Sequence, residues 1–145
     1  MQYWLKLWGT GKRPYAGTPK DYLPEDHLTF GGNSGCPRIA DGDCLVILGV
    51  GTGGKLVATV EADSKVTLQR DVKHDWPYRC DSHIELIVED LDRAPRFSVL
   101  PGAENLERWL KTRKGYRKLT KEQYDAACRV IRGAGGRRPS RNRNR

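Results

Sequence analysis

Five stretches of this chain show the alternation of apolar and polar side chains that is typical of β-strands. In the first stretch, the odd-numbered residues Tyr3, Leu5 and Leu7 share one face and the even-numbered residues share the other. The second stretch is apolar throughout, which predicts burial on both of its faces. The five expected strands cover residues 3–8, 44–48, 55–61, 65–70 and 79–89.

Two helices are expected in the C-terminal third. Residues 104–111 repeat apolar side chains at i, i+3 and i+4, the spacing of one helix face. Thr120 and Gln123 have the spacing of a capping box, and Gly133 follows an apolar stripe, so a second helix is predicted between Thr120 and Gly133. Strands joined by short hairpins, with helices towards the end, predict an α+β fold. We expect a small curved or barrel-like sheet of about five to six strands with flanking helices.

Residues 9–39 show no clear period and are rich in Gly and Pro. The only element expected there is a short helical turn at residues 24–28. Irregular segments of this length are uncommon in a compact domain and tend to be functional. The segment is therefore a candidate for one side of a binding site.

Length and composition limit the class of protein. A chain of 145 residues corresponds to about one domain, and 37% hydrophobic residues can supply its core. No apolar run approaches the ~18 residues of a membrane span, and the first residues lack the pattern of a secretion signal. We therefore expect a cytoplasmic protein with no membrane partner.

Neither a metal nor a cofactor is expected. The four cysteines lack CxxC spacing and the three histidines are scattered, so the thiols are interpreted as reduced core or surface groups. No nucleotide, phosphate or hydrolase motif is found, and no catalytic residue is assigned. A group of acids around the end of the fifth strand could hold a divalent ion, but a solvated strand edge is the preferred interpretation. These acids are Glu85, Glu89, Asp90 and Asp92.

The net charge of +8 is concentrated at the C-terminus. Residues 132–145 contain six arginines and no acid, and they are too polar to fold alone, so we expect a disordered tail after a domain at residues 1–131. The tail is either a solubilising end or an arm that binds phosphates. The second interpretation is preferred because nothing in the tail balances its charge.

Trp76 is the strongest candidate for a binding residue. It precedes Pro77 at a strand entrance, beside the polar residues Asp75 and Arg79. An indole in this setting either stacks on a base, which is worth ~1–3 kcal/mol, or is buried in the core. Stacking is the preferred interpretation, and Asp75 could then accept a hydrogen bond from an exocyclic amine.

The order of these features resembles the PUA-like readers of modified bases, namely the EVE and YTH domains. Four features carry the resemblance: an aromatic first strand, a buried strand with a Gly-rich hairpin, a Trp before the next long strand, and a capped C-terminal helix. They correspond to residues 3–8, residues 45–54, Trp76 with residues 84–91, and residues 119–131. The resemblance implies a non-catalytic domain that holds a flipped, usually methylated base in an aromatic cage.

The resemblance also implies a base-binding set, formed by the end of the first strand, the long loop and the Trp76 corner. The chain has no Trp at the family's first cage position, where either Phe30 or the polar pair Asn33 and Ser34 would substitute. This departure favours the EVE branch and a modified cytosine or other DNA base, with DNA preferred over RNA. The implied base-binding residues are Trp8, Gly9, Phe30, Asn33, Ser34, Asp75, Trp76 and Tyr78.

Basic residues of the C-terminal third are candidates for contacts with the nucleic-acid backbone, although they could equally form a solvated surface. They are Arg108, Lys111, Arg113, Lys114, Arg117, Lys118, Arg137, Arg138 and Arg141.

Two other functions stay open. One is an enzyme of the same broad fold, an ASCH-type hydrolase acting on a modified nucleoside, which would require a catalytic Lys with a Glu or Thr that the sequence does not locate. The other is a protein-interaction module whose tail binds an acidic partner. A reader could also work with an effector protein.

Overall fold

The computed structural model describes residues 1–9, 15, 22–32, 35–69, 76–112 and 114–139. Its strands are β1 (Tyr3–Trp8), β2 (His27–Phe30), β3 (Cys44–Gly49), β4 (Lys55–Ala62), β5 (Thr67–Leu68), β6 (Tyr78–Ile87) and β7 (Tyr116–Leu119). Its helices are the 3-10 turns η2 (Leu91–Arg93) and η3 (Phe97–Val99) and the α-helices α2 (Ala103–Leu110) and α3 (Lys121–Gly133). In this part of the chain, no helix is long and apolar enough to cross a membrane.

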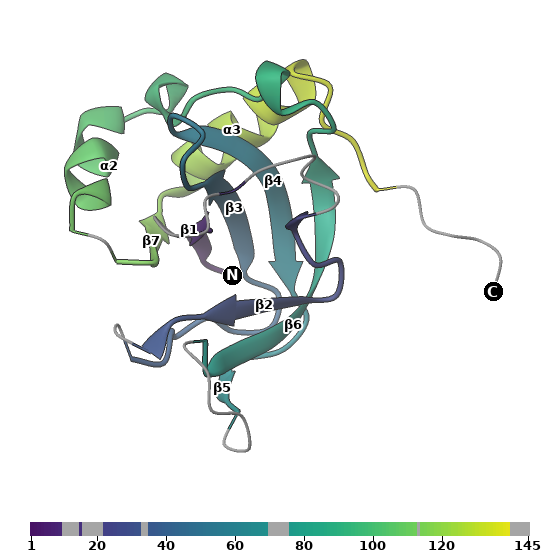
Figure 1. Cartoon of the computed structure of the whole chain (residues 1–145), viewed down its shortest axis with the longest axis vertical. Helices are drawn as coiled ribbons and strands as arrows, with labels where there is room; N and C mark the ends of the chain where they lie inside the picture. The colour runs from purple at the N-terminus through teal and green to yellow at the C-terminus, as the bar shows by residue number, and fades with distance from the viewer. Residues whose placement is uncertain (10–14, 16–21, 33–34, 70–75, 113, 140–145) are drawn as a thin grey trace, which may run out of the picture.

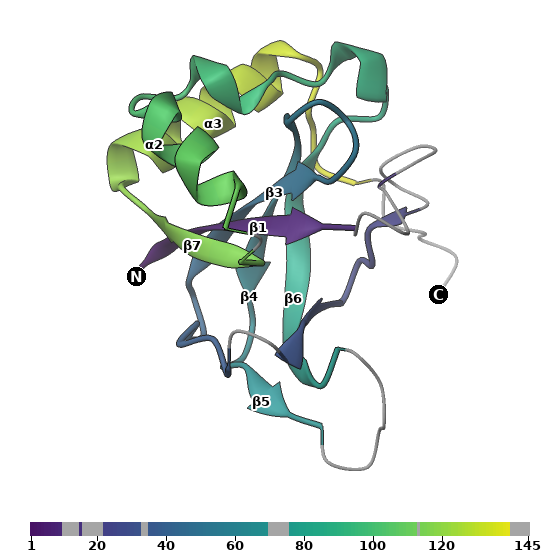
Figure 2. The same ribbon diagram turned by 60° about the vertical axis from the view of Figure 1, so that its left-hand side comes forward.

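The described strands form one mixed sheet in the order β2-β6-β4-β3-β1-β7, with β5 paired to β6. The pair β1–β3 is parallel and the other pairs are antiparallel. Figure 1 and Figure 2 show α2 and α3 gathered over one end of the molecule, with β2 and β5 towards the other end. The α+β class and the small curved sheet expected from the sequence are confirmed.

The curl of the sheet brings its two end strands together. Phe30 of β2 lies edge-on to Tyr116 of β7, with ring centroids 5.9 Å apart, although β2 and β7 stand at opposite ends of the strand order. Lys6 of the neighbouring strand β1 also reaches Phe30, with its Nζ atom 4.2 Å from the ring centroid. The alternation of side chains then separates an inner face, which carries Lys6 and Phe30, from an outer face.

Helix α3 covers the outer face. It packs across β1, β3, β4 and β6, and its Tyr124 ring lies 4.8 Å from that of Tyr3. The capping box predicted at its start is confirmed: the Thr120 hydroxyl accepts from the Gln123 amide at 3.1 Å, and the Thr120 amide donates to the Gln123 side chain at 3.0 Å. Because these two bonds satisfy donors that a helix start leaves free, α3 begins where its sequence indicates.

A β-bulge in β6 changes the direction of one side chain. Thr59 of β4 pairs with Leu86 and Val60 pairs with Ile84, so Glu85 is the extra residue of β6. Strict alternation would point Glu85 and Leu86 to opposite faces, but both line the same cavity beneath α3. Alternation from His83 already puts Glu85 on the outer face, and the bulge brings Leu86 to that face as well.

Some elements differ from the expectation. Strands β2 and β7 were not predicted, and the helical turn expected at residues 24–28 is replaced by the start of β2. The fourth strand is reduced to Thr67–Leu68. Both missed strands have only four residues, and pairing with longer partners holds them in place, which local sequence does not encode.

The C-terminal segment is more ordered than expected over its described residues. Helix α3 continues to Gly133, and Arg137 then forms a backbone bridge with Ile87 through bonds of 2.9 and 3.2 Å. Between them the chain passes so close to Ile131 that a Cβ atom on Gly136 would lie 2.4 Å from the Ile131 side chain. Residues 132–137, which were expected to belong to the tail, therefore include the end of α3 and a backbone-paired residue.

Replacing Phe30 with Ala is expected to lower the free energy of unfolding by ~3–5 kcal/mol. The Phe30 side chain is 1% exposed and contacts both β1 and β7, so its loss opens a cavity where the sheet closes. Urea denaturation measures the change. Val99→Ala, at an exposed apolar side chain, is the control and should stay within about 0.5 kcal/mol of the wild type. A Phe30→Ala loss below about 1 kcal/mol would contradict the closing role.

Candidate functional site

The end of the sheet formed by β2, β5 and the start of β6 brings several predicted base-binding residues together. Phe30 and Tyr78 pair directly across β2 and β6. A side chain added at Gly32 would touch Pro77, with 3.5 Å between the Cβ atom and Cγ, so the loop after β2 runs beside the residue that follows Trp76. The two segments that the sequence assigned to one site are therefore neighbours.

Trp76 is exposed on this end of the molecule. Its side chain is 38% exposed, and Leu68 of the adjoining strand is 48% exposed. The two belong to one structural unit, since Leu68 pairs with Tyr78 and the Gln69 amide donates to the Pro77 carbonyl at 2.7 Å. Trp76 is consequently a surface residue, and the alternative of a fully buried core Trp does not apply.

The other predicted base-binding residues lie at different depths. Phe30 is in the core, whereas Tyr78 and Trp8 are half-buried. The Trp8 indole nitrogen donates to the Tyr22 carbonyl at 3.2 Å, and Gly9 follows with a φ of 100°. Asp75, Asn33 and Ser34 lie outside the described residues.

Lys6 is a functional candidate that sequence reasoning missed. It is 2% exposed on the inner face, and its Nζ atom lies 5.0 Å from the Trp8 ring centroid and 4.2 Å from that of Phe30. The ammonium donates to the Leu7 carbonyl at 3.3 Å, and the described residues give it no carboxylate partner. The alternation in β1 puts Lys6 on the same face as Trp4 and Trp8. This position of a lysine between two aromatic residues is the sequence signal that could have identified it.

Burial determines the protonation of this interior. Loss of water around the ammonium lowers the pKa of Lys6 to about 7, although the nearby Cys80 raises it slightly. Burial also raises the pKa of the Cys80 thiol to about 11. The inner face thus holds a thiol that stays protonated and an amine that is partly neutral near pH 7, next to three predicted base-binding aromatic residues.

The basic residues predicted to contact phosphates fall into two groups. Figure 1 and Figure 2 show α2 and β7 on one side of the molecule and the C-terminal segment on the other. In the first group, Arg117 lies over Trp109 at 5.9 Å and Lys118 over Trp4 at 5.6 Å. The first group also holds the exposed Arg108, Lys111 and Lys114, the second holds Arg137 and Arg138, and Arg113 and Arg141 lie outside the described residues.

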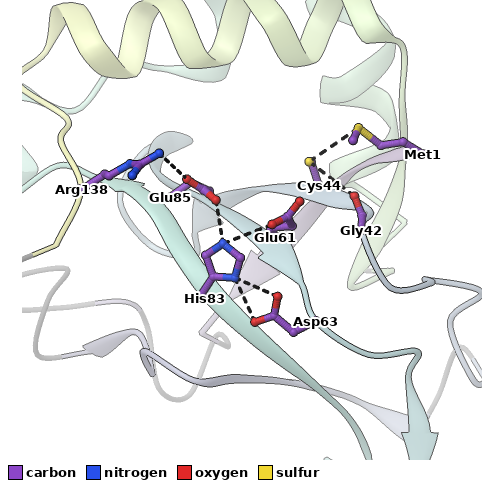
Figure 3. Close-up of polar contacts among 8 residues, drawn as sticks. All are labelled: Met1, Gly42, Cys44, Glu61, Asp63, His83, Glu85 and Arg138. Carbon is purple, nitrogen blue, oxygen red and sulfur yellow. Dashed lines mark hydrogen bonds and ion pairs between the residues drawn. The ribbon is translucent and has the colours of Figure 1, made fainter. Parts of the chain in front are cut away.

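A second polar centre lies on the outer face beneath α3 (Figure 3). The His83 ring contacts Glu61 at 3.2 Å and Glu85 at 2.6 Å through Nε2, and both Asp63 carboxylate oxygens at 2.9 Å through Nδ1. Hydrogen bonds to Asp63 first, and to Glu85, raise the pKa of His83, while burial opposes them. Of the acids singled out from the sequence, Glu85 alone belongs here.

A cavity of about 580 Å³ adjoins this centre. Its sheet side carries Glu61 and Glu85, and its helix side carries arginines and the Tyr124 phenol. Sequence reasoning missed the centre because Glu61 and His83 meet only through the register of β4 and β6. The remaining lining residues are Cys44, Thr59, Leu86, Asp125, Cys128, Arg129, Arg132 and Arg138.

Comparison with known proteins identifies relatives of the fold. The chain resembles the NMR structure of Rpa0253 from Rhodopseudomonas palustris, with a TM-score of 0.63 and 12% identity over 90% of this chain and 93% of that one. It also resembles the crystal structure of Atu2648 from Agrobacterium tumefaciens, with a TM-score of 0.56 and 17% identity over 93% and 94% of the two chains. No family model and no curated protein matches. At these identities the likeness shows a shared fold.

Replacing Lys6 with Met is expected to stabilise the protein at pH 7 and to change how stability depends on pH. The folded pKa of Lys6, about 7, lies below its unfolded value of about 10.5, so the unfolded state holds the extra proton between these values. The free energy of unfolding of the wild type should therefore rise as pH increases from about 7 to about 10.5. Below pH 7 Lys6 is protonated in both states, so the cost of burying its ammonium does not change with pH.

Urea denaturation at several pH values between about 6 and about 10 measures this effect. Lys6→Met should lack the wild-type gain, while the control Lys65→Met, at an exposed lysine, should keep it. Identical pH profiles for Lys6→Met and the wild type would show that Lys6 is not buried as an amine.

Proposed function

We propose that this protein is a PUA-like reader of the EVE type, which binds nucleic acid and holds a modified base without altering it. The observation that carries the proposal is the exposed Trp76, two residues before Tyr78, which pairs with the exposed Leu68 on one side and with Phe30 on the other. An indole face and an apolar neighbour on the surface suit stacking against a base, which tolerates added methyl groups.

The curved α+β sheet is compatible with this proposal, and so is the arrangement of the inner face. Phe30 is too deeply buried to form a wall of an open cage, so its role is to support the site from below. Tyr78 and Trp8 are half-buried, which leaves part of each ring accessible. In the proposed complex, Trp76 stacks on the base, and Tyr78 with Trp8 borders it.

Phosphate contacts in the proposed complex come from the group on α2 and β7. Arg108, Lys111 and Lys118 are exposed there, and their charges would add affinity that does not depend on sequence. Arg137 and Arg138 lie on the opposite side, so they would contact the backbone only of a strand that passes around the molecule. The ligand that we favour is DNA carrying a modified cytosine.

The buried Lys6 gives a second candidate function some support. An amine with a pKa of about 7 can act as a base or as a nucleophile near neutral pH, as an ASCH-type hydrolase of modified nucleosides would require. The described residues place no carboxylate on Lys6, so the reader is preferred. Incubation with a panel of modified nucleosides, followed by chromatography, separates the two, because a reader returns every nucleoside unchanged.

Replacing Trp76 with Ala is expected to weaken binding to an oligonucleotide with one modified cytosine by roughly 5- to 150-fold, the equivalent of ~1–3 kcal/mol of stacking. Binding to the unmodified strand should change less. Fluorescence anisotropy with matched oligonucleotides measures both affinities, and Trp76→Phe should keep most of the preference because it keeps an aromatic face.

Thermal unfolding of the same variants supplies the control. Trp76→Ala should melt close to the wild type, since the side chain is on the surface. A variant that melts normally and binds every strand as the wild type does would remove Trp76 from the site. A wild type that does not prefer any modified base over the plain strand would refute the reader.

Deleting residues 140–145 is expected to weaken binding to modified and plain strands alike. The deletion removes three arginines and leaves the bridged residue Arg137 in place. The slope of log K against log salt should fall by up to roughly 2–3, because each phosphate that an arginine neutralises adds about 0.9 to it. Replacing the same three arginines with Lys keeps the charge and should keep the slope, and an unchanged slope after the deletion would exclude the tail from the complex.

A further inference from the structure

We propose that Glu61, His83 and Glu85 form a binding site for a divalent transition-metal ion, with open coordination positions facing the cavity beneath α3. This inference is independent of the proposed reader function, because the centre lies on the outer face of the sheet. One ligand atom from each of the three residues can be chosen so that all three lie within 4.8 Å of one another. Figure 3 shows the three side chains pointing toward one another.

Backbone geometry positions the three ligands. Glu61 and His83 are direct partners across β4 and β6, so their side chains leave the same face of the sheet. Glu85 joins them because it lies two residues after His83 on β6, so its side chain leaves the same face of the sheet. The His83 Nε2 atom lies 3.2 Å from Glu61, close to the ~3.3 Å between two ligands of a tetrahedral ion, and 2.6 Å from Glu85, a hydrogen-bond distance that an ion would widen.

Asp63 has the position of a supporting residue. Its two carboxylate oxygens each lie 2.9 Å from His83 Nδ1, on the side of the ring away from the glutamates. Histidines that ligate metals commonly donate their second N–H group to a carboxylate, which fixes the tautomer and directs the free nitrogen to the metal. Asp63 would thus leave the Nε2 lone pair facing Glu61 and Glu85.

The charge around His83 favours a dication. Three carboxylates contact one imidazole, so a negative excess of about two remains even when the ring carries a proton. Arg138 offsets part of this excess, but its guanidinium lies 3.8 Å from Glu85 Oε2 and leaves the other oxygen to His83. Arg129 and Arg132 line the cavity on α3, and in the described part of the chain they form no ion pair with these acids.

A second, separate observation is a buried polar group without a partner in the wall of the cavity. Thr59 lies two residues before Glu61 on β4, lines the same cavity and is 0% exposed. Its hydroxyl oxygen has no hydrogen-bond partner in the described part of the protein. A buried hydroxyl without a partner costs ~1–3 kcal/mol. Water on a metal ion at Glu61 and Glu85, or a ligand on that ion, would supply the partner that Thr59 lacks.

The ligand set indicates which metal fits. One imidazole nitrogen with two carboxylates suits Zn²⁺, Mn²⁺ or Fe²⁺, whereas Mg²⁺ and Ca²⁺ prefer oxygen ligands alone. Three protein ligands leave at least one position for water or a bound anion, as in catalytic zinc sites. Cys44 also lines the cavity, but the group whose ligand atoms come together consists of Glu61, His83 and Glu85.

Titration of the full, untagged chain with Zn²⁺ and Co²⁺ tests the site. Isothermal calorimetry should show one ion per chain, and the Co²⁺ complex should show d–d bands without the thiolate charge-transfer band that cysteine ligands produce. His83→Ala and the near-isosteric Glu61→Gln should each weaken binding at least tenfold. Asp63→Asn should weaken binding by roughly 10- to 100-fold, as expected for a supporting carboxylate.

Two variants serve as matched controls. His27→Ala removes a histidine whose ring contacts the exposed Asp26 at 2.7 Å, and Glu89→Gln removes an exposed carboxylate near the end of β6. Both should bind Zn²⁺ as the wild type does. Thermal unfolding without metal shows whether each variant is folded, and Glu61→Gln keeps the test valid if His83→Ala is not. Wild-type affinity in Glu61→Gln, equal losses in the controls, or a thiolate band with Co²⁺ would overturn the proposal.

Discussion

The contact of Phe30 with Lys6 and Tyr116 is the constraint on which the rest of the structure depends. A sheet with the strand order β2-β6-β4-β3-β1-β7 could lie open, with β2 and β7 as distant edges. Phe30 instead crosses the interior and meets both β1 and β7. Its ring fills the space between the two edges, so the inner face becomes a core and the outer face is left for α3.

This closure gives the two faces different chemistry. Inside, Lys6 is taken out of water among aromatic rings, and its amine loses part of its charge. Outside, β4 and β6 present acids around His83, and Glu85, two residues further along β6, completes that group. Each face thus keeps polar groups where simple packing would favour apolar ones, and such exceptions are more often functional than structural.

The sequence predicts the long elements well and the meeting of distant residues poorly. Alternation located β1, β3, β4 and β6, and the capping box located α3, because these signals are local. Strands β2 and β7 were missed, since four-residue strands depend on their partners. The nearness of Phe30 to Tyr78 was anticipated through the resemblance to reader domains. Glu85 shares a face with His83 by simple alternation, but the meeting of Glu61 and Asp63 with His83 depends on the register of β4 and β6, which has no signature in a single sequence.

The backbone bridge between Arg137 and Ile87 fixes the point from which the chain leaves the domain. The close approach of Gly136 to Ile131 leaves no room for a side chain there, so the direction of departure is also set. About six fully extended residues span at most ~20 Å. Chain length alone therefore keeps the last three arginines within about that distance of Pro139. Because they are tethered, these arginines present a high local concentration of positive charge to any ligand bound within that distance. Surfaces further away are out of their reach.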